Sequence, residues 1–151
     1  MREKCLSYII GSRRDIKFYD KKYNSSYLRE IAYPLEISEK ELKKYIQKSF
    51  AREVCKLELH HPKICLIFYK NNIEGQEIEI NGLIDKYWIT GEIIDVEYIN
   101  NNQKQNLEIA IDIELDKEIV YSEIKNILYD EHGSRRILFY ESINECWIKR
   151  L

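Results

Sequence analysis

Residues 87–115 read YWITGEIIDVEYINNNQKQNLEIAIDIEL, and this stretch decides the fold class. Apolar and polar side chains alternate on both sides of the polar run 100–105, a period of two that is typical of half-buried strands. The polar run has the composition of a hairpin loop. The stretch therefore predicts two long antiparallel strands, 87–99 and 106–115, joined by a short connection.

The same period of two continues on both sides of this hairpin. Further strands are expected at 5–10, 16–19, 57–60, 64–69, 76–80, 137–140 and 146–148. Gly11-Ser12-Arg13-Arg14 has the composition of a turn between the first two of these strands. Short connections favour antiparallel neighbours, so we expect an antiparallel meander.

Two helices are expected between the strands. Ser38-Glu39-Lys40-Glu41 has the pattern of a capping box, and apolar residues recur at three- and four-residue spacing up to about residue 53. Asp116 is placed to cap a second helix whose apolar positions include Val120 and Ile124. The first helix carries most of its lysines outside the apolar stripe, so we expect its outer face to be basic.

These elements predict one α+β domain over residues 1–151. We expect a mostly antiparallel sheet of about six to eight strands, with two main amphipathic helices packed on one face. Only 5 glycines and 2 prolines occur in 151 residues, which leaves no stretch with the composition of a flexible linker. A chain of this length is sufficient for one core.

Composition narrows the class of protein further. The chain is 44% hydrophobic and 33% charged, as folded proteins are. The longest apolar run, Ile64–Tyr69, is far shorter than the roughly 20 residues that span a bilayer. Met1–Ile10 lacks a signal-peptide core, so we expect a cytoplasmic protein with no membrane partner.

The cysteines do not indicate a disulfide framework or a metal centre. Four widely spaced cysteines in a chain with a core of ordinary size favour reduced, buried thiols. One cluster has metal-ligating residue types but no paired ligand spacing, and it comprises Cys55, His60, His61 and Cys65. We therefore expect no metal and no cofactor.

Charge is strongly segregated along the chain, although the net charge is only −2. Residues 1–73 carry 16 Lys/Arg and 9 Asp/Glu, whereas residues 74–131 carry 4 and 15. Segregation of this kind bears on association with charged partners rather than on the fold. It predicts a basic first half and an acidic second half.

Strand alternation makes the acidic part more specific. Residues two apart on a strand share a face, so the carboxylates of the predicted strands are expected on one face, opposite isoleucines and valines. The expected partner-binding carboxylates are Glu77, Glu79, Asp95, Glu97, Glu108, Asp112 and Glu114. Like charges across neighbouring strands destabilise a sheet, so such a face is either a solvated surface or one that awaits a basic partner.

Two alternatives stay open. A small metal-independent nuclease or transferase could use His60, His61 or His132, with Lys63 and the arginine pairs 13–14 and 135–136. A phage- or nucleic-acid-associated adaptor could use the lysines of the first helix, although the acidic face disfavours a nucleic acid nearby. The stretches 11–19 and 133–140 share the letters Gly-Ser-Arg-Arg, which indicates two turns or paired phosphate-binding arginines.

No nucleotide-binding, hydrolase or metalloprotease motif occurs in the chain. An acidic face without a catalytic signature favours a non-enzymatic protein that covers a basic macromolecule. Bacterial immunity proteins and antitoxins against nuclease toxins act in this way, because a nuclease cleft is positive. We therefore expect a basic protein partner, such as a nuclease toxin.

Overall fold

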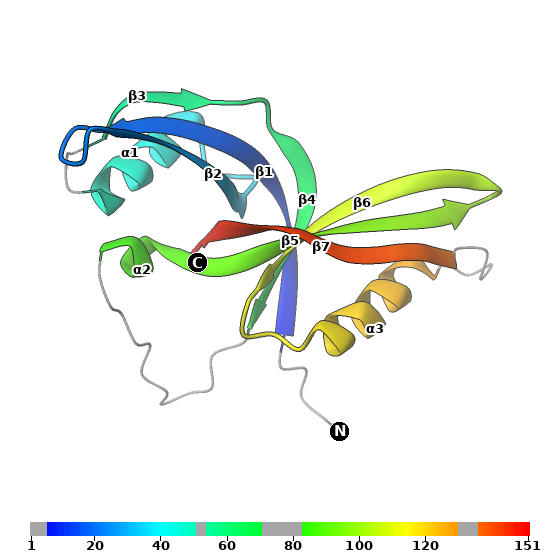
Figure 1. Cartoon of the computed structure of the whole chain (residues 1–151). Helices are drawn as coiled ribbons and strands as arrows, with labels where there is room; N and C mark the ends of the chain where they lie inside the picture. Colours follow the sequence, from blue (N-terminus) through cyan, green and yellow to red (C-terminus); the bar gives the residue numbers. More distant parts are fainter. Residues whose placement is uncertain (1–5, 51–53, 71–82, 130–135) are drawn as a thin grey trace, which may run out of the picture.

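The computed structural model describes residues 6–50, 54–70, 83–129 and 136–151. Within these residues, seven strands form a mixed sheet and two main helices lie outside it, which confirms the α+β class (Figure 1). The first half contains β1 (Leu6–Asp20), β2 (Ser25–Pro34), α1 (Glu39–Ser49), β3 (Val54–Leu59) and β4 (Lys63–Lys70). The second half contains α2 (Leu83–Tyr87), β5 (Trp88–Asn100), β6 (Gln103–Asp112), α3 (Lys117–Leu128) and β7 (Arg136–Lys149).

The strand pairings join six strands into a closed ring. β1 pairs antiparallel with β2 on one edge and with β3 and β4 on the other, and β5 pairs antiparallel with β6 and β7. Two short parallel pairings, β2 with β7 and β4 with β6, connect the halves. The predicted meander is therefore wrong at these two joints, where strands distant in sequence become neighbours.

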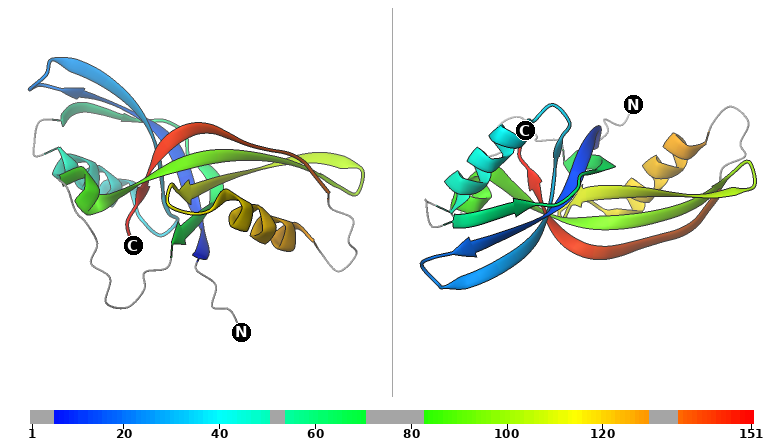
Figure 2. Two further views of the ribbon diagram at one scale, coloured as in Figure 1. Left: turned by 60° about the horizontal axis from the view of Figure 1, so that its bottom comes forward. Right: turned by 90° about the horizontal axis from the view of Figure 1, so that it is seen from above.

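Each half extends an arm away from this ring. Beyond the joints, β1, β2 and β3 form one arm and β5, β6 and β7 form the other, and the arms point in opposite directions (Figure 2). α1 lies along the first arm and α3 along the second (Figure 1). The two helices thus cover separate parts of the sheet.

The halves repeat the same architecture. In each half, a long hairpin is followed by a capped helix. A strand after that helix, β4 in the first half and β7 in the second, pairs with the free edge of the first hairpin strand. Ser38 accepts a hydrogen bond from the Glu41 amide at the start of α1, and Asp116 accepts one from the Glu118 amide at the start of α3. Glu30-Ile31-Ala32 in β2 matches Glu108-Ile109-Ala110 in β6.

Gly11 and Gly91 mark the equivalent point in the two halves. A Cβ atom at Gly11 would lie 2.4 Å from Ile67 Cδ1 and 2.6 Å from the Tyr33 carbonyl oxygen. A Cβ atom at Gly91 would lie 2.5 Å from Ile148 Cδ1 and 2.6 Å from the carbonyl oxygen of residue 111. Gly11 is thus needed for close strand crossing, and the predicted turn at 11–14 is wrong because β1 runs through it.

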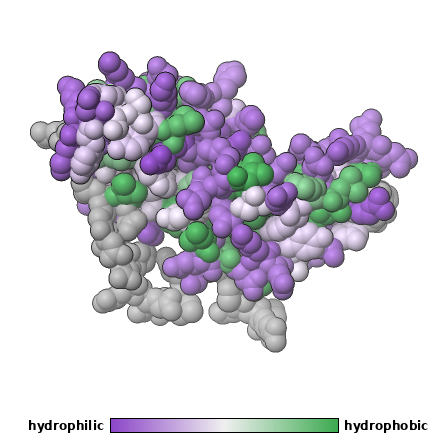
Figure 3. Space-filling view, in the orientation of Figure 1, coloured by the Kyte–Doolittle hydropathy of each residue, from purple (hydrophilic) through white to green (hydrophobic). Residues whose placement is uncertain are grey.

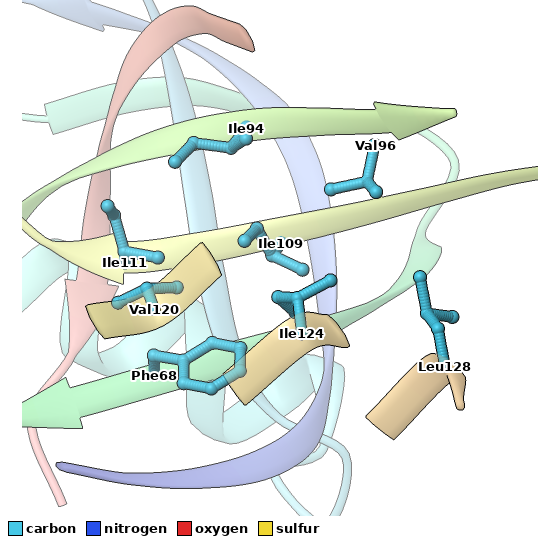
Figure 4. Close-up of a cluster of buried hydrophobic side chains, with 8 residues drawn as sticks. All are labelled: Phe68, Ile94, Val96, Ile109, Ile111, Val120, Ile124 and Leu128. Atoms are coloured by element: carbon cyan, nitrogen blue, oxygen red, sulfur yellow. The ribbon is translucent and has the colours of Figure 1, made fainter. Parts of the chain in front are cut away.

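Three apolar clusters follow from strand alternation. α3 packs on Ile94 and Val96 of β5 and on Ile109 and Ile111 of β6 (Figure 4). α1 packs through Leu42 and Ile46 on the outer face of β1 and β2, and on Trp88. The third cluster lies on the opposite face of the strands, inside the ring, and comprises Ala32, Cys65, Ile67, Tyr69, Ile93, Ala110, Cys146 and Ile148.

The Gly-Ser-Arg-Arg sequence shared by 11–19 and 133–140 does not correspond to the repeat of the two halves, because the structural counterpart of Gly11 is Gly91. Residues 133–135 lie outside the described residues. In the part of the chain that the structure describes, no helix is long and apolar enough to cross a membrane.

Candidate functional site

The predicted carboxylates divide into three groups. Asp95 and Glu97 lie on β5 and Glu108 on β6, on the strand face opposite the α3 cluster. Asp112 and Glu114 lie at the end of β6 and just beyond it. The predicted Glu77 and Glu79 lie outside the described residues.

Carboxylates face one another directly on the second arm. Asp95 pairs in register with Glu108 of β6 on one side and with Glu141 of β7 on the other. Burial, followed by the charges of Glu108 and Glu97, raises the pKa of Asp95 above its ordinary value. We call Asp95, Glu97, Glu108 and Glu141 the acidic face.

Few cations neutralise the acidic face. The exposed Lys104 Nζ lies 3.3 Å from Glu97 Oε2. Arg13 of β1 reaches Glu108 with its Nε, and no basic side chain among the described residues pairs with Glu141 within 4 Å. The face therefore holds more negative charge than its neighbours offset.

Arg13 is an internal residue rather than a ligand-binding one. Its Nη1 lies 3.3 Å from Glu30 Oε2, and its Nε donates to Glu108. Burial alone would lower the pKa of Arg13, but the carboxylates of Glu108 and Glu30 raise it. Burial raises the pKa of Glu30 in spite of Arg13. The arginine therefore links equivalent glutamates of the two halves.

Asp112 and Glu114 have other contacts. Asp112 is buried and accepts a hydrogen bond from the Glu114 amide at 3.0 Å. Burial raises the pKa of Asp112. Glu114 is exposed and lies 3.4 Å from Lys70 Nζ. Asp112 thus stabilises the turn after β6 and offers little surface to a partner.

A hollow of ≈ 660 Å³ opens where β2 separates from β7, and Asp15, Glu30, Asn144 and Glu145 contribute to its lining. Asn144 Nδ2 donates to Glu30 at 3.1 Å, and Asp15 Oδ1 is buried without a hydrogen-bond partner. Within the described residues, no group of three His, Cys, Asp or Glu side chains is arranged to hold a metal ion.

Among the residues proposed for catalysis, Arg13 lies in register with Lys63 of β4, but its guanidinium group is engaged by Glu30 and Glu108. His60 and His61 are exposed where β3 gives way to β4, and His132 lies outside the described residues. Arg14 donates to the His60 carbonyl oxygen at 2.6 Å. Burial raises the pKa of the Cys65 thiol to about 12 and also raises that of Cys146. Burial thus disfavours the thiolate form of both cysteines, which is the nucleophilic form.

Sequence reasoning missed Glu141 as a member of the acidic face. It also missed the ion pair between Arg13 and Glu30. The tripeptide Glu-Ile-Ala, which occurs in β2 and β6, is the signal that equivalent glutamates exist. Comparison with protein-family models, curated proteins and solved structures finds no match, so similarity assigns neither a family nor a function to the chain.

Proposed function

We propose that this chain is a non-enzymatic binding protein that neutralises a basic protein, such as a nuclease toxin, by covering it with the acidic face. This is the mode of action of an immunity protein or an antitoxin, and we place it in the cytoplasm. The observation that carries the proposal is the register of Asp95 between Glu108 and Glu141.

This register is costly for the isolated protein. Like charges directly opposite each other on neighbouring strands destabilise a sheet by roughly 0.2–1 kcal/mol per pair. A basic partner relieves this repulsion, because its lysines and arginines bring cations between the carboxylates. The acidic face also raises the rate of encounter with a positive surface.

The surroundings of the acidic face support binding through charge. It lies on the arm opposite α1, so the lysines of α1 do not neutralise it (Figure 1). On the side of the molecule seen in Figure 3, hydrophilic residues predominate and apolar residues form small separate patches. On that side, charged and polar groups rather than a large apolar patch face a partner.

The test is capture of the partner from a lysate of the source cells by immobilised protein. The acidic-face variant combines Asp95→Asn, Glu97→Gln and Glu141→Gln, and it spares Glu108 because that residue holds Arg13. We expect the wild type to retain a basic protein and the variant to release it. Co-expression should then show that the wild type, but not the variant, relieves the toxicity of the captured protein.

The matched control is Lys40→Gln, Lys43→Gln and Lys44→Gln on α1, which changes three exposed charges at the other end of the molecule. We expect this variant to capture the same partner. Loss of capture in the control, together with retention in the acidic-face variant, would contradict the proposal.

A further inference from the structure

Lysines gather on and around α1 without acidic partners. Lys40, Lys43, Lys44 and Lys48 are exposed on α1, and Lys86 is exposed on α2. Among the described residues, no carboxylate lies within 4 Å of these ammonium groups. With Lys149 of β7, we call these six lysines the basic end.

Two tyrosines lie among these lysines. The ring centroids of Tyr45 and Tyr87 are 6.0 Å apart. Lys149 Nζ lies 4.2 Å and Lys48 Nζ 6.0 Å from the centroid of Tyr45, and Lys86 Nζ lies 5.6 Å from that of Tyr87. Proteins that bind single-stranded nucleic acid combine two kinds of side chain: basic ones that contact the phosphates, and aromatic ones that stack on the bases.

Lys149 is the unusual member of the basic end. It is only 8% exposed, and its Nζ donates to the Arg150 carbonyl oxygen at 2.8 Å, with no carboxylate as counter-charge among the described residues. Burial, and then the charge of Arg150, lowers the pKa of Lys149. A buried cation without an anion costs stability, and a bound phosphate offsets that cost.

The other half of the chain shows that the fold does not need these lysines. Aligned on the capping residues Ser38 and Asp116, α3 has Glu118, Tyr121, Ser122 and Asn126 where α1 has its four lysines. Aligned on Ile67 and Ile148, which contact the equivalent glycines, β4 has the buried Phe68 where β7 has Lys149. The lysines are therefore a feature of one half and not of the shared scaffold.

We propose that the basic end binds single-stranded nucleic acid, with the lysines on phosphates and the Tyr45 and Tyr87 rings beside the bases. The acidic face does not oppose this binding, because it lies on the opposite arm from α1 (Figure 1). The two surfaces act separately, so this activity does not depend on the toxin-neutralising role.

Fluorescence anisotropy with labelled oligothymidylate and oligouridylate of about 20 nucleotides, longer than the roughly 4–16 nucleotides that single-strand binders cover, tests the proposal. We expect salt-dependent binding by the wild type. The variant Lys40→Gln, Lys43→Gln, Lys44→Gln and Lys48→Gln should bind at least about tenfold more weakly. Its salt slope should fall by ~0.7 for each phosphate that the lysines no longer neutralise.

Lys149→Met separates a binding role from a structural one. We expect it to raise the melting temperature, because a buried charge is replaced by an apolar group, and to weaken oligonucleotide binding. The control Lys63→Gln with Lys125→Gln changes exposed lysines outside the basic end that form no ion pair among the described residues, and it should bind as the wild type does. Equal binding by all variants would overturn the proposal, as would preference for duplex DNA or for anionic phosphatidylserine vesicles over the single strand.

Discussion

Glu30 and Glu108, equivalent residues of the two halves, share the single guanidinium group of Arg13. The side chains of Arg13, Glu30 and Glu108 are 11%, 18% and 23% exposed, so solvent weakens this network only in part. Because β2 and β6 belong to different halves, the network fixes one half on the other. The counterpart of Arg13 in β5 is the buried Ile93, which is why one arginine serves both glutamates.

Replacing Arg13 tests this link. Arg13→Met leaves two partly buried carboxylates without their cation, and we expect a loss of about 2 kcal/mol in the free energy of unfolding, measured by urea denaturation at neutral pH. Adding Glu30→Gln and Glu108→Gln should recover part of the loss. Arg14→Met is the matched control and should cost less, since Arg14 donates to the backbone oxygen of an exposed residue. Equal losses for both arginines would contradict the link.

The two glycines at the strand crossings should be equally intolerant of a side chain. Gly11→Ala and Gly91→Ala each bring a methyl group to within 2.6 Å of a backbone carbonyl oxygen. This oxygen belongs to a neighbouring strand, so it can move away only if the strands separate. We expect each to lower stability by about 1–3 kcal/mol. Thr90→Ala, at an exposed neighbouring position, should have little effect in the same thermal melts. A large loss for only one of the two glycines would argue against equivalent halves.

Much of the local structure could be predicted from sequence, because it depends on short-range chemistry. Ser38 and Asp116 start α1 and α3 as expected. The hairpin of β5 and β6 has the predicted alternation, although its turn is shorter than the predicted loop. Asn101 and Asn102 adopt positive φ angles of 51° and 63°, which suit a two-residue hairpin turn.

The long-range arrangement could not be predicted, because two short parallel pairings decide it. Ile31 with Trp147 and Leu66 with Ile109 join strands that are distant in sequence, and no local pattern marks them. The same pairings limit the candidate site. They bring Arg13 from the first half to Glu108, so a carboxylate predicted to be free is already partnered.

Charge reversal on the acidic face should separate folding from binding. Asp95→Lys with Glu141→Lys puts two facing lysines in place of two facing carboxylates, but it sets a cation opposite Glu108, so we expect stability to change by no more than about 1 kcal/mol. Partner capture should be lost. Glu118→Lys on α3 reverses an exposed charge away from the acidic face and should retain the partner. Unchanged capture after the double reversal would exclude this face as the interface.

The pH dependence of stability should have opposite signs at Asp95 and Glu92. Burial and Glu108 raise the pKa of Asp95, so its contribution to stability is present below the ordinary aspartate pKa and is lost as pH rises through the folded-state pKa. Hydrogen bonding to Lys117, whose Nζ lies 2.8 Å from Glu92 Oε2, lowers the pKa of Glu92, so its contribution is present above the ordinary glutamate pKa and is lost in acid.

Urea denaturation between about pH 3 and pH 7, which spans the ordinary pKa values of Asp and Glu, measures both effects. At pH 7, Asp95→Asn should be more stable than the wild type by a few tenths of a kcal/mol up to about 1 kcal/mol, and Glu92→Gln should be less stable. The Asp95 difference should shrink as the pH falls and the Asp95 carboxyl becomes protonated, and the Glu92 difference should shrink only as the pH falls through the lowered folded-state pKa of Glu92. If Asp95→Asn instead destabilises the protein at pH 7, Asp95 has a favourable partner in the free protein, and repulsion on the acidic face is not available to drive binding.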